Sequence, residues 1–105
     1  PEVNEFELAG LPPLASTQVR PPRVAESPVT LECRRTQVLQ LQGVDGVQVP
    51  TWLVLGEVVA VHIDTALLKD GVYDTASAGH ILRAGGPADY FTVGPEQLFK
   101  MHRPR

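Results

Sequence analysis

The stretch WLVLGEVVAVHID, residues 52–64, is the longest apolar run in the chain and decides its fold. It is rich in Val, Leu and Ile and too short to cross a bilayer as a helix, which favours a β-strand. Successive residues of a strand face opposite sides, and here both sides are apolar except at Glu57 and His62. The run therefore predicts a central strand, buried on both faces. Gly56 marks a bend or a close approach beside Glu57.

The preceding segment predicts a partner strand. Residues 29–41 alternate between apolar and polar side chains, which is typical of a long, half-buried antiparallel strand. Arg35 and Gln37 fall on the apolar face, so either the strand passes beyond the core there or a bulge resets its phase. Cys33 lies on the apolar face and is expected to be a small core residue. Residues 43–46, GVDG, supply turn residues, so we expect a hairpin.

The rest of the chain predicts only short elements. Residues 1–28 hold six of the ten prolines, which favours an extended, Pro-rich arm that docks through a few apolar anchors; alternatively, the arm is disordered. After the central strand, Asp64 is expected to cap a helical turn over residues 66–68. Asp74 is a second start signal, and it predicts a short helix over residues 75–82. A short strand over residues 90–93 and a turn over 95–101 complete the domain.

Composition bounds the function. The chain has 105 residues, the usual size of a single domain. Its formal net charge is −3, and acidic and basic residues are mixed along the sequence, so no charged surface is expected that would attract nucleic acid or a membrane. The single cysteine excludes an internal disulfide and fits a reducing compartment, so we expect a cytoplasmic protein. The sequence starts at Pro1 rather than Met, which suggests a trimmed, processed or partial chain. It lacks the signatures of hydrolases, kinases and metalloproteases, and no metal site is expected.

Two groups of residues are candidates for chemistry. His62 and Asp64 share a face of a strand, so the carboxylate could orient the imidazole; alternatively, His62 is a half-exposed strand-end residue and Asp64 only a helix cap. Arg83, followed by two glycines, suits a phosphate or a flavin carbonyl; alternatively, it is a solvated residue in the last turn of a helix. Tyr90 is either a stacking platform or a core residue. His80 is expected on a helix surface.

Four motifs carry a family resemblance: EFELAG, PPRVAESPVTLEC, GEVVAVHID and HILRAGGPADYF. In this order and at these spacings they resemble the C-terminal half of the flavin reductase-like family, which includes the reductase component of nitrilotriacetate monooxygenase and the flavoredoxins. The resemblance implies a mainly β fold, part of a six-stranded antiparallel split β-barrel with short helices. It also implies bound FMN, NADH or NADPH as co-substrate, and a homodimer.

The resemblance also implies a set of site residues. His62 is the candidate catalytic residue. The candidate cofactor-binding residues are Ser27, Glu57, Arg83, Gly85, Gly86 and Tyr90.

The resemblance also implies a departure, because relatives place roughly a further half-domain before the point where this chain starts. Either the chain is a fragment, or the rest belongs to another chain, or this is a reduced relative without FMN. We therefore treat residues 1–105 as one partial domain, which we expect to associate with a second copy or a complementing half-domain. The alternative function is a non-enzymatic β module or assembly subunit. A histidine-based acid/base enzyme ranks last, since it lacks a nucleophile and an oxyanion donor.

Overall fold

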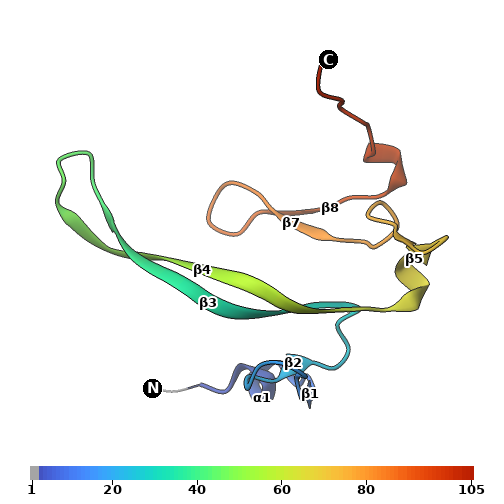
Figure 1. The fold of residues 1–105 in the computed structure, drawn as a ribbon, viewed down its shortest axis with the longest axis horizontal. Coiled ribbons are helices and arrows are strands. Elements are labelled where there is room, and N and C mark those ends of the chain that lie inside the picture. Colours follow the sequence, from blue (N-terminus) through green and yellow to red (C-terminus); the bar gives the residue numbers. More distant parts are fainter. Residues whose placement is uncertain (1–2) are drawn as a thin grey trace. The chain divides into compact units, whose positions relative to one another are not determined.

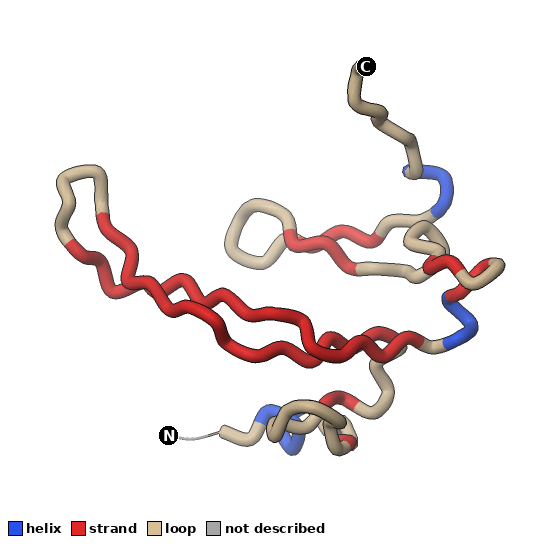
Figure 2. Tube along the Cα trace, viewed as in Figure 1, coloured by secondary structure: helices blue, strands red, loops and turns tan. Residues whose placement is uncertain are grey.

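The computed structural model describes residues 3–105, which form mainly β-structure, as predicted (Figures 1 and 2). The elements are α1 (Glu5–Ala9), β1 (Pro13–Leu14), β2 (Arg23–Val24), β3 (Val29–Gln42), β4 (Gln48–Ile63), the 3-10 helix η1 (Thr65–Leu67), β5 (Leu68–Lys69), β6 (Val72–Tyr73), β7 (Ile81–Arg83), β8 (Tyr90–Thr92) and the 3-10 helix η2 (Pro95–Gln97). Within the described residues, the strands pair two by two in chain order, in four two-stranded antiparallel sheets. Two compact units result, Pro1–Ile63 and Asp64–Arg105.

The β3–β4 hairpin dominates the first unit and confirms the predicted strand pair (Figure 1). Its register shifts between Glu32 and Cys33, between Arg35 and Gln37, and again near the turn. The second shift is the β-bulge that we predicted as one explanation for Arg35 and Gln37 on the apolar face. It resets the alternation of the strand. A Cβ on Gly56 would lie 3.3 Å from the carbonyl oxygen of Arg34 on β3, so this glycine permits a close approach of the two backbones.

The predicted turn is also present. The amide of Gly46 donates to the carbonyl of Gly43, and the amide of Gly43 donates to the carbonyl of Val47. Asp45 accepts from the Val47 amide through its side chain, at 3.0 Å. Gly46 has a φ of 81°, which explains why the turn needs glycine at this position.

The prediction of a central strand buried on both faces is wrong for the structure described here. In residues 3–105, β4 pairs only with β3, and no apolar residue is buried. A two-stranded ribbon has no second layer, so its apolar side chains stay open on both faces. Cys33 is exposed as well, and is not the core residue that its position in the pattern predicted.

The arm, residues 1–28, is less extended than its prolines predict. Residues 1–2 lie outside the described part. The side chain of Asn4 accepts from the Phe6 amide and starts α1, and Gly10, with a φ of 67°, ends it. Between residues 1 and 12 there is no proline, so one helical turn fits there. Further on, β1 and β2 pair and fold the arm back on itself.

In the second unit, the helical turn predicted after Asp64 is present, and the helix predicted over residues 75–82 is not. Asp64 accepts from the Ala66 amide and caps η1, as predicted. The Asp70-Gly71 pair, with φ values of 53° and 76°, forms the two-residue turn of the β5–β6 hairpin instead of only ending a helix. The helix over residues 75–82 is wrong: Gly79, with a φ of 68°, follows a single turn, and Ile81 already belongs to β7.

The end of the chain agrees with the sequence pattern. β8 covers most of the strand predicted over residues 90–93, and η2 supplies the helical turn expected after it. β8 pairs with β7 through a loop over residues 84–89, which brings Arg83 opposite Tyr90. Among residues 3–105, no helix has both the length and the hydropathy needed to span a membrane.

Candidate functional site

The first unit is organised around Glu32, the one buried charged residue that the structure describes there. Glu32 is 2% exposed and lies on β3. Its carboxylate accepts hydrogen bonds from three consecutive backbone amides of the arm: Thr17 at 2.9 Å, Gln18 at 2.7 Å and Val19 at 3.2 Å. The Thr17 hydroxyl donates as well, at 3.1 Å. The carboxylate thereby fixes the arm on the hairpin.

His62 completes this cluster from the other strand. Its Nε2 lies 2.5 Å from Oε2 of Glu32. The hairpin register explains the contact, since His62 stands opposite Thr30 and Ala60 opposite Glu32, which places both side chains near one another at the end of β4. The His62 side chain is 24% exposed, so part of the imidazole remains accessible.

The hydrogen bonds set the charge state of Glu32. The Thr17 amide, helped by His62 and Gln18, lowers the pKa of the Glu32 carboxyl from 4.5 to about 2, against the opposing effect of desolvation. The group is therefore an anion at neutral pH, and an anion can only accept hydrogen bonds. Arg34 adds a second contact between β3 and the arm, because its guanidinium donates a hydrogen bond to the Gln18 carbonyl at 2.8 Å.

The other predicted residues of the first unit lie apart from this contact. Ser27 is half-buried between β2 and β3, where its hydroxyl donates to the Val29 carbonyl at 2.7 Å. Glu57 is exposed on β4, opposite Arg34. Asp64 caps η1 and does not hold His62, so the alternative of a cap is confirmed. The carboxylate that orients the imidazole is Glu32 instead.

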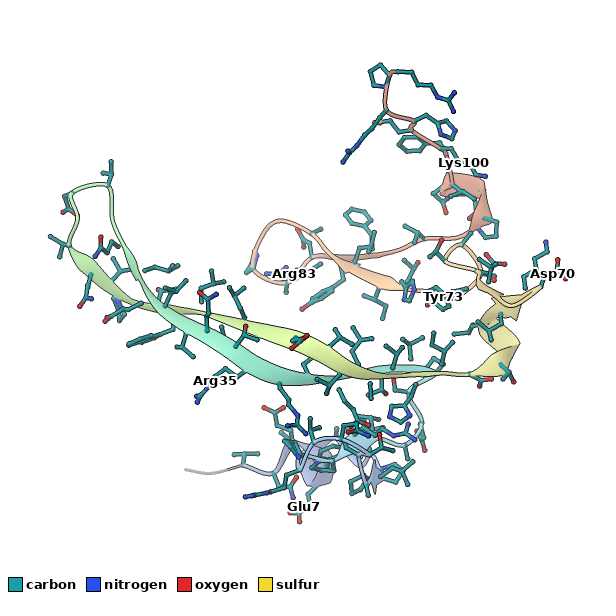
Figure 3. All side chains as sticks on the ribbon, in the orientation of Figure 1. Glu7, Arg35, Asp70, Tyr73, Arg83 and Lys100 are labelled. Carbon is teal, nitrogen blue, oxygen red and sulfur yellow. The ribbon has the colours of Figure 1, made fainter. Side chains whose placement is uncertain are left out.

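The second unit contains a loop organised by Arg83 (Figure 3). The guanidinium donates to four backbone carbonyls of its own hairpin, at 3.1–3.3 Å; these belong to Ala84, Gly86, Pro87 and Asp89. It also lies over the Tyr90 ring, 5.2 Å from the centroid. Arg83 is thus neither in a helix nor freely solvated: it holds the Gly-Gly loop in shape.

Around that loop, two predicted residues present open surface. Tyr90 is 60% exposed and therefore is not a core residue in the described structure. A Cβ on Gly85 would meet no atom within 4 Å, so its backbone stands free. An exposed aromatic ring beside open glycine backbone suits a planar, polar-edged ligand.

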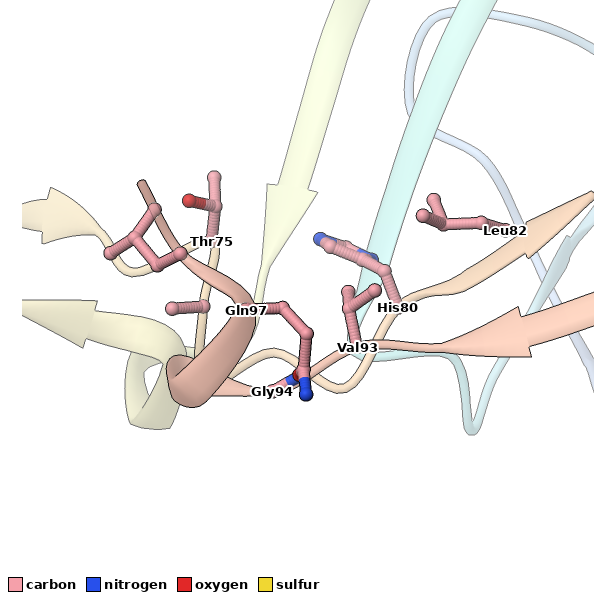
Figure 4. A pocket seen from close by; sticks show the side chains of 8 residues that line it. Thr75, His80, Leu82, Val93, Gly94 and Gln97 are labelled. Atoms are coloured by element: carbon pink, nitrogen blue, oxygen red, sulfur yellow. The ribbon is translucent and has the colours of Figure 1, made fainter. Parts of the chain in front are cut away.

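His80 lies in a pocket rather than on a helix (Figure 4). Its Nε2 is 2.6 Å from the Tyr73 hydroxyl. The pocket has a volume of about 260 Å³, and its lining is mostly apolar: Thr75, Ala76, His80, Leu82, Val93, Gly94, Gln97 and Leu98. Gln97 shapes one wall, since its side-chain oxygen accepts from the Gly94 amide at 2.6 Å.

Sequence reasoning missed Glu32 and the contact between Tyr73 and His80. The alternation of residues 29–41 puts Glu32 on the polar face of its strand, which gives no sign that it is buried. Counting the hairpin register outward from the GVDG turn would have placed Glu32 opposite Val58, because the register shifts cannot be counted from sequence. The donors from the arm have no local signal either. For Tyr73, the signal was the Asp70-Gly71 turn, which is typical of a hairpin.

Comparison with known families agrees with the motifs. Residues 1–81 match the sequence model of the "Flavin reductase like domain". The match covers the arm, the β3–β4 hairpin and His62 and stops before Arg83. Among solved structures, nitrilotriacetate monooxygenase component B from Bacillus cereus is similar, with a TM-score of 0.77 and 28% identity over 92% of this chain and 47% of that one.

Two further relatives are uncharacterised proteins. One, from Halalkalibacterium halodurans, is 34% identical over 104 residues, which are 99% of this chain and 48% of the relative. The other, from Aquifex aeolicus, is 31% identical over 72 residues, or 69% of this chain and 33% of the relative. The chain thus spans half or less of the length of these relatives.

Proposed function

The chain belongs to the flavin reductase-like family, and on that basis we propose that it binds FMN and passes electrons from NADH or NADPH to flavin. The observation that carries the proposal is the family match across the arm, the hairpin and His62. The proposed active form is an assembly, either a homodimer or a pair with a complementing half-domain. The exposed apolar faces of β3 and β4 support such an assembly.

Within that proposal, FMN supplies the hydride chemistry, and this chain binds and orients. Tyr90 and the Gly85 backbone offer an open surface for the cofactor, and Arg83 holds the loop in shape. Gly86, beside the Asp89 carboxylate, is proposed to contact the cofactor through its backbone. Ser27 and Glu57, in the first unit, are also proposed as cofactor-binding residues. The residues present therefore fit a flavin.

His62 is the proposed catalytic residue. Its imidazole is held at the end of β4 and is still partly accessible, which suits a group that positions the nicotinamide or hydrogen-bonds the flavin ring. Such a contact is made chiefly during hydride transfer and contributes little to the resting affinity for FMN.

The test is a titration of the purified full chain with FMN, followed by anaerobic addition of NADH or NADPH. We expect saturable binding, a yellow protein, and loss of the visible flavin absorbance after the nicotinamide is added. His102→Ala, in the C-terminal tail, serves as a control that keeps both properties. Absence of saturable FMN binding by both the chain alone and its assembly with a complementing half-domain, or reduction no faster than that of free FMN, contradicts the proposal.

A second candidate function is a non-enzymatic assembly subunit. It is favoured by one observation: among residues 3–105 no apolar side chain is buried, so the hairpin offers a large surface for other chains. The titration separates the two functions, because an assembly subunit associates with its partner but shows no saturable binding of FMN.

A further inference from the structure

We propose that Glu32 is a positioning residue for His62, which fixes the imidazole with a proton on Nε2 and leaves Nδ1 as the nitrogen that meets the substrate. The inference rests on the proposed function only for what His62 does. The orientation of the imidazole follows from the hydrogen bonds of this chain and can be measured without any flavin.

The first step concerns the proton between Glu32 and His62. Every other partner of the Glu32 carboxylate is a donor, three amides and one hydroxyl. Hydrogen bonds from three amides to the two carboxylate oxygens favour the ionised form, which can only accept. The low pKa of Glu32 agrees with this. Nε2 of His62 must therefore donate.

The second step concerns rigidity. The donors come from residues 17–19, on the arm, while Glu32 itself lies on β3 and His62 on β4. With both carboxylate oxygens engaged and only 2% of the residue exposed, the carboxylate has no room to swing. The imidazole is thus hydrogen-bonded to an immobile carboxylate, which lowers the entropy cost of orienting the ring when a substrate binds.

The third step concerns the free edge of the ring. Within residues 3–105, no hydrogen bond involves Nδ1 of His62, and 24% of the side chain is exposed. A neutral ring with hydrogen on Nε2 offers Nδ1 as an acceptor. The complementary group on the substrate is then an N–H or O–H donor, such as a carboxamide. The proposal therefore assigns a donor-bearing substrate edge to His62.

Nuclear magnetic resonance of the purified full chain without flavin tests the orientation. We expect a downfield Nε2–H proton of His62, protected from exchange with water. In Glu32→Gln this signal should shift upfield, because a neutral amide oxygen is a weaker acceptor than a carboxylate. The wild-type spectrum is decisive even where the variant folds poorly: an Nε2 without a proton overturns the proposal.

Kinetics in the presence of FMN test the positioning role. Glu32→Gln should slow NAD(P)H-dependent reduction of bound flavin by about tenfold with FMN affinity within a few-fold, since the contact acts in the transition state. Added to His62→Ala, it should cause no further loss, because the two residues act as a unit. Glu7→Gln, an exposed position on α1, is the matched control. A loss that adds fully to that of His62→Ala shows a separate structural role and overturns the proposal.

The NMR and kinetic experiments together distinguish a failure of the proposed function from a failure of the proposed role of Glu32. A wild-type chain that reduces no flavin but shows the protected Nε2–H proton contradicts the proposed function and supports the orientation. A chain that reduces flavin with Nε2 of His62 unprotonated contradicts the inference alone.

Discussion

Glu32 and Arg83 are both charged residues that form several hydrogen bonds to the backbone, but their partners differ greatly in sequence separation. Glu32 is buried, and its partners lie 13 to 30 residues away in the sequence. Arg83 is exposed, and its partners lie within six residues. The carboxylate joins an arm and two strands, whereas the guanidinium shapes only the loop in which it stands.

The difference shows which interactions hold residues 3–105 together, where no apolar side chain is buried. Where no apolar side chain is buried, segments far apart in sequence need another reason to meet, and a buried, fully hydrogen-bonded carboxylate supplies one. A loop within one hairpin needs fewer stabilising interactions, because closing a short hairpin costs little conformational entropy. Loss of Glu32 should therefore affect the whole first unit, and loss of Arg83 only one hairpin.

The largest effect is expected from Glu32→Ala. Three amides lose their acceptor at once, so the arm should detach from the hairpin. We expect limited proteolysis within residues 15–23 to become more than about tenfold faster, because cleavage follows the population of the opened arm. Glu7→Ala, which removes an exposed carboxylate, should leave the rate unchanged. Equal rates in the two variants contradict the role of Glu32.

The acid dependence of the first unit should follow Glu32. Its pKa falls from 4.5 to about 2 in the folded chain, so the unfolded chain takes up the proton first as the pH drops. The stabilisation is fully present above pH 4.5 and is lost progressively as the pH falls toward 2. Urea midpoints measured across this window should decline in the wild type and stay flatter in Glu32→Gln. An identical acid slope in both proteins excludes Glu32 as the cause.

A more local effect is expected from Arg83. Arg83→Ala removes the four hydrogen bonds that hold the loop, so Gly85 and Tyr90 are no longer kept in place for the cofactor. FMN binding should weaken by about one to two decades, which corresponds to roughly 1.5–3 kcal/mol. His80→Ala should have a much smaller effect. Absorbance titration with FMN measures both. Comparable losses remove Arg83 from the cofactor site.

The smallest effect separates two adjacent glycines. Gly86 has a φ of 71°, and an alanine there should destabilise the β7–β8 hairpin by about 1–2 kcal/mol. The Cβ of Gly85→Ala meets open space, so that variant should change stability by less than about 0.5 kcal/mol. Hydrogen exchange of the β7–β8 amides compares the two. Similar losses of protection argue against a backbone origin.

The parts of the fold that rest on local signals were predictable. The hairpin followed from alternation, its bulge from the misplaced Arg35 and Gln37, and the cap of η1 from Asp64. The helix over residues 75–82 failed because a correct start signal at Asp74 was extended past Gly79. The buried central strand failed because its cover depends on segments that these residues do not supply.

The candidate site was predictable only in part. His62 and Arg83 stood out by residue type and position, yet their partners did not. The amides that hold Glu32 come from residues 17–19, which carry no pattern that links them to β3. The orientation of Arg83 depends on carbonyls presented by its own turn, a backbone geometry that sequence does not specify. The roles of the cofactor-binding residues stay predictions.

The most direct test of the account is single-turnover reduction of bound FMN by NADH or NADPH, with wild type and His62→Ala compared at full FMN occupancy. The account predicts FMN affinities within a few-fold and reduction slower by about tenfold or more in His62→Ala, because a group that acts in hydride transfer contributes to the rate rather than to ground-state binding. An unchanged rate constant would mean that His62 only fills the end of β4 and has no part in the reaction.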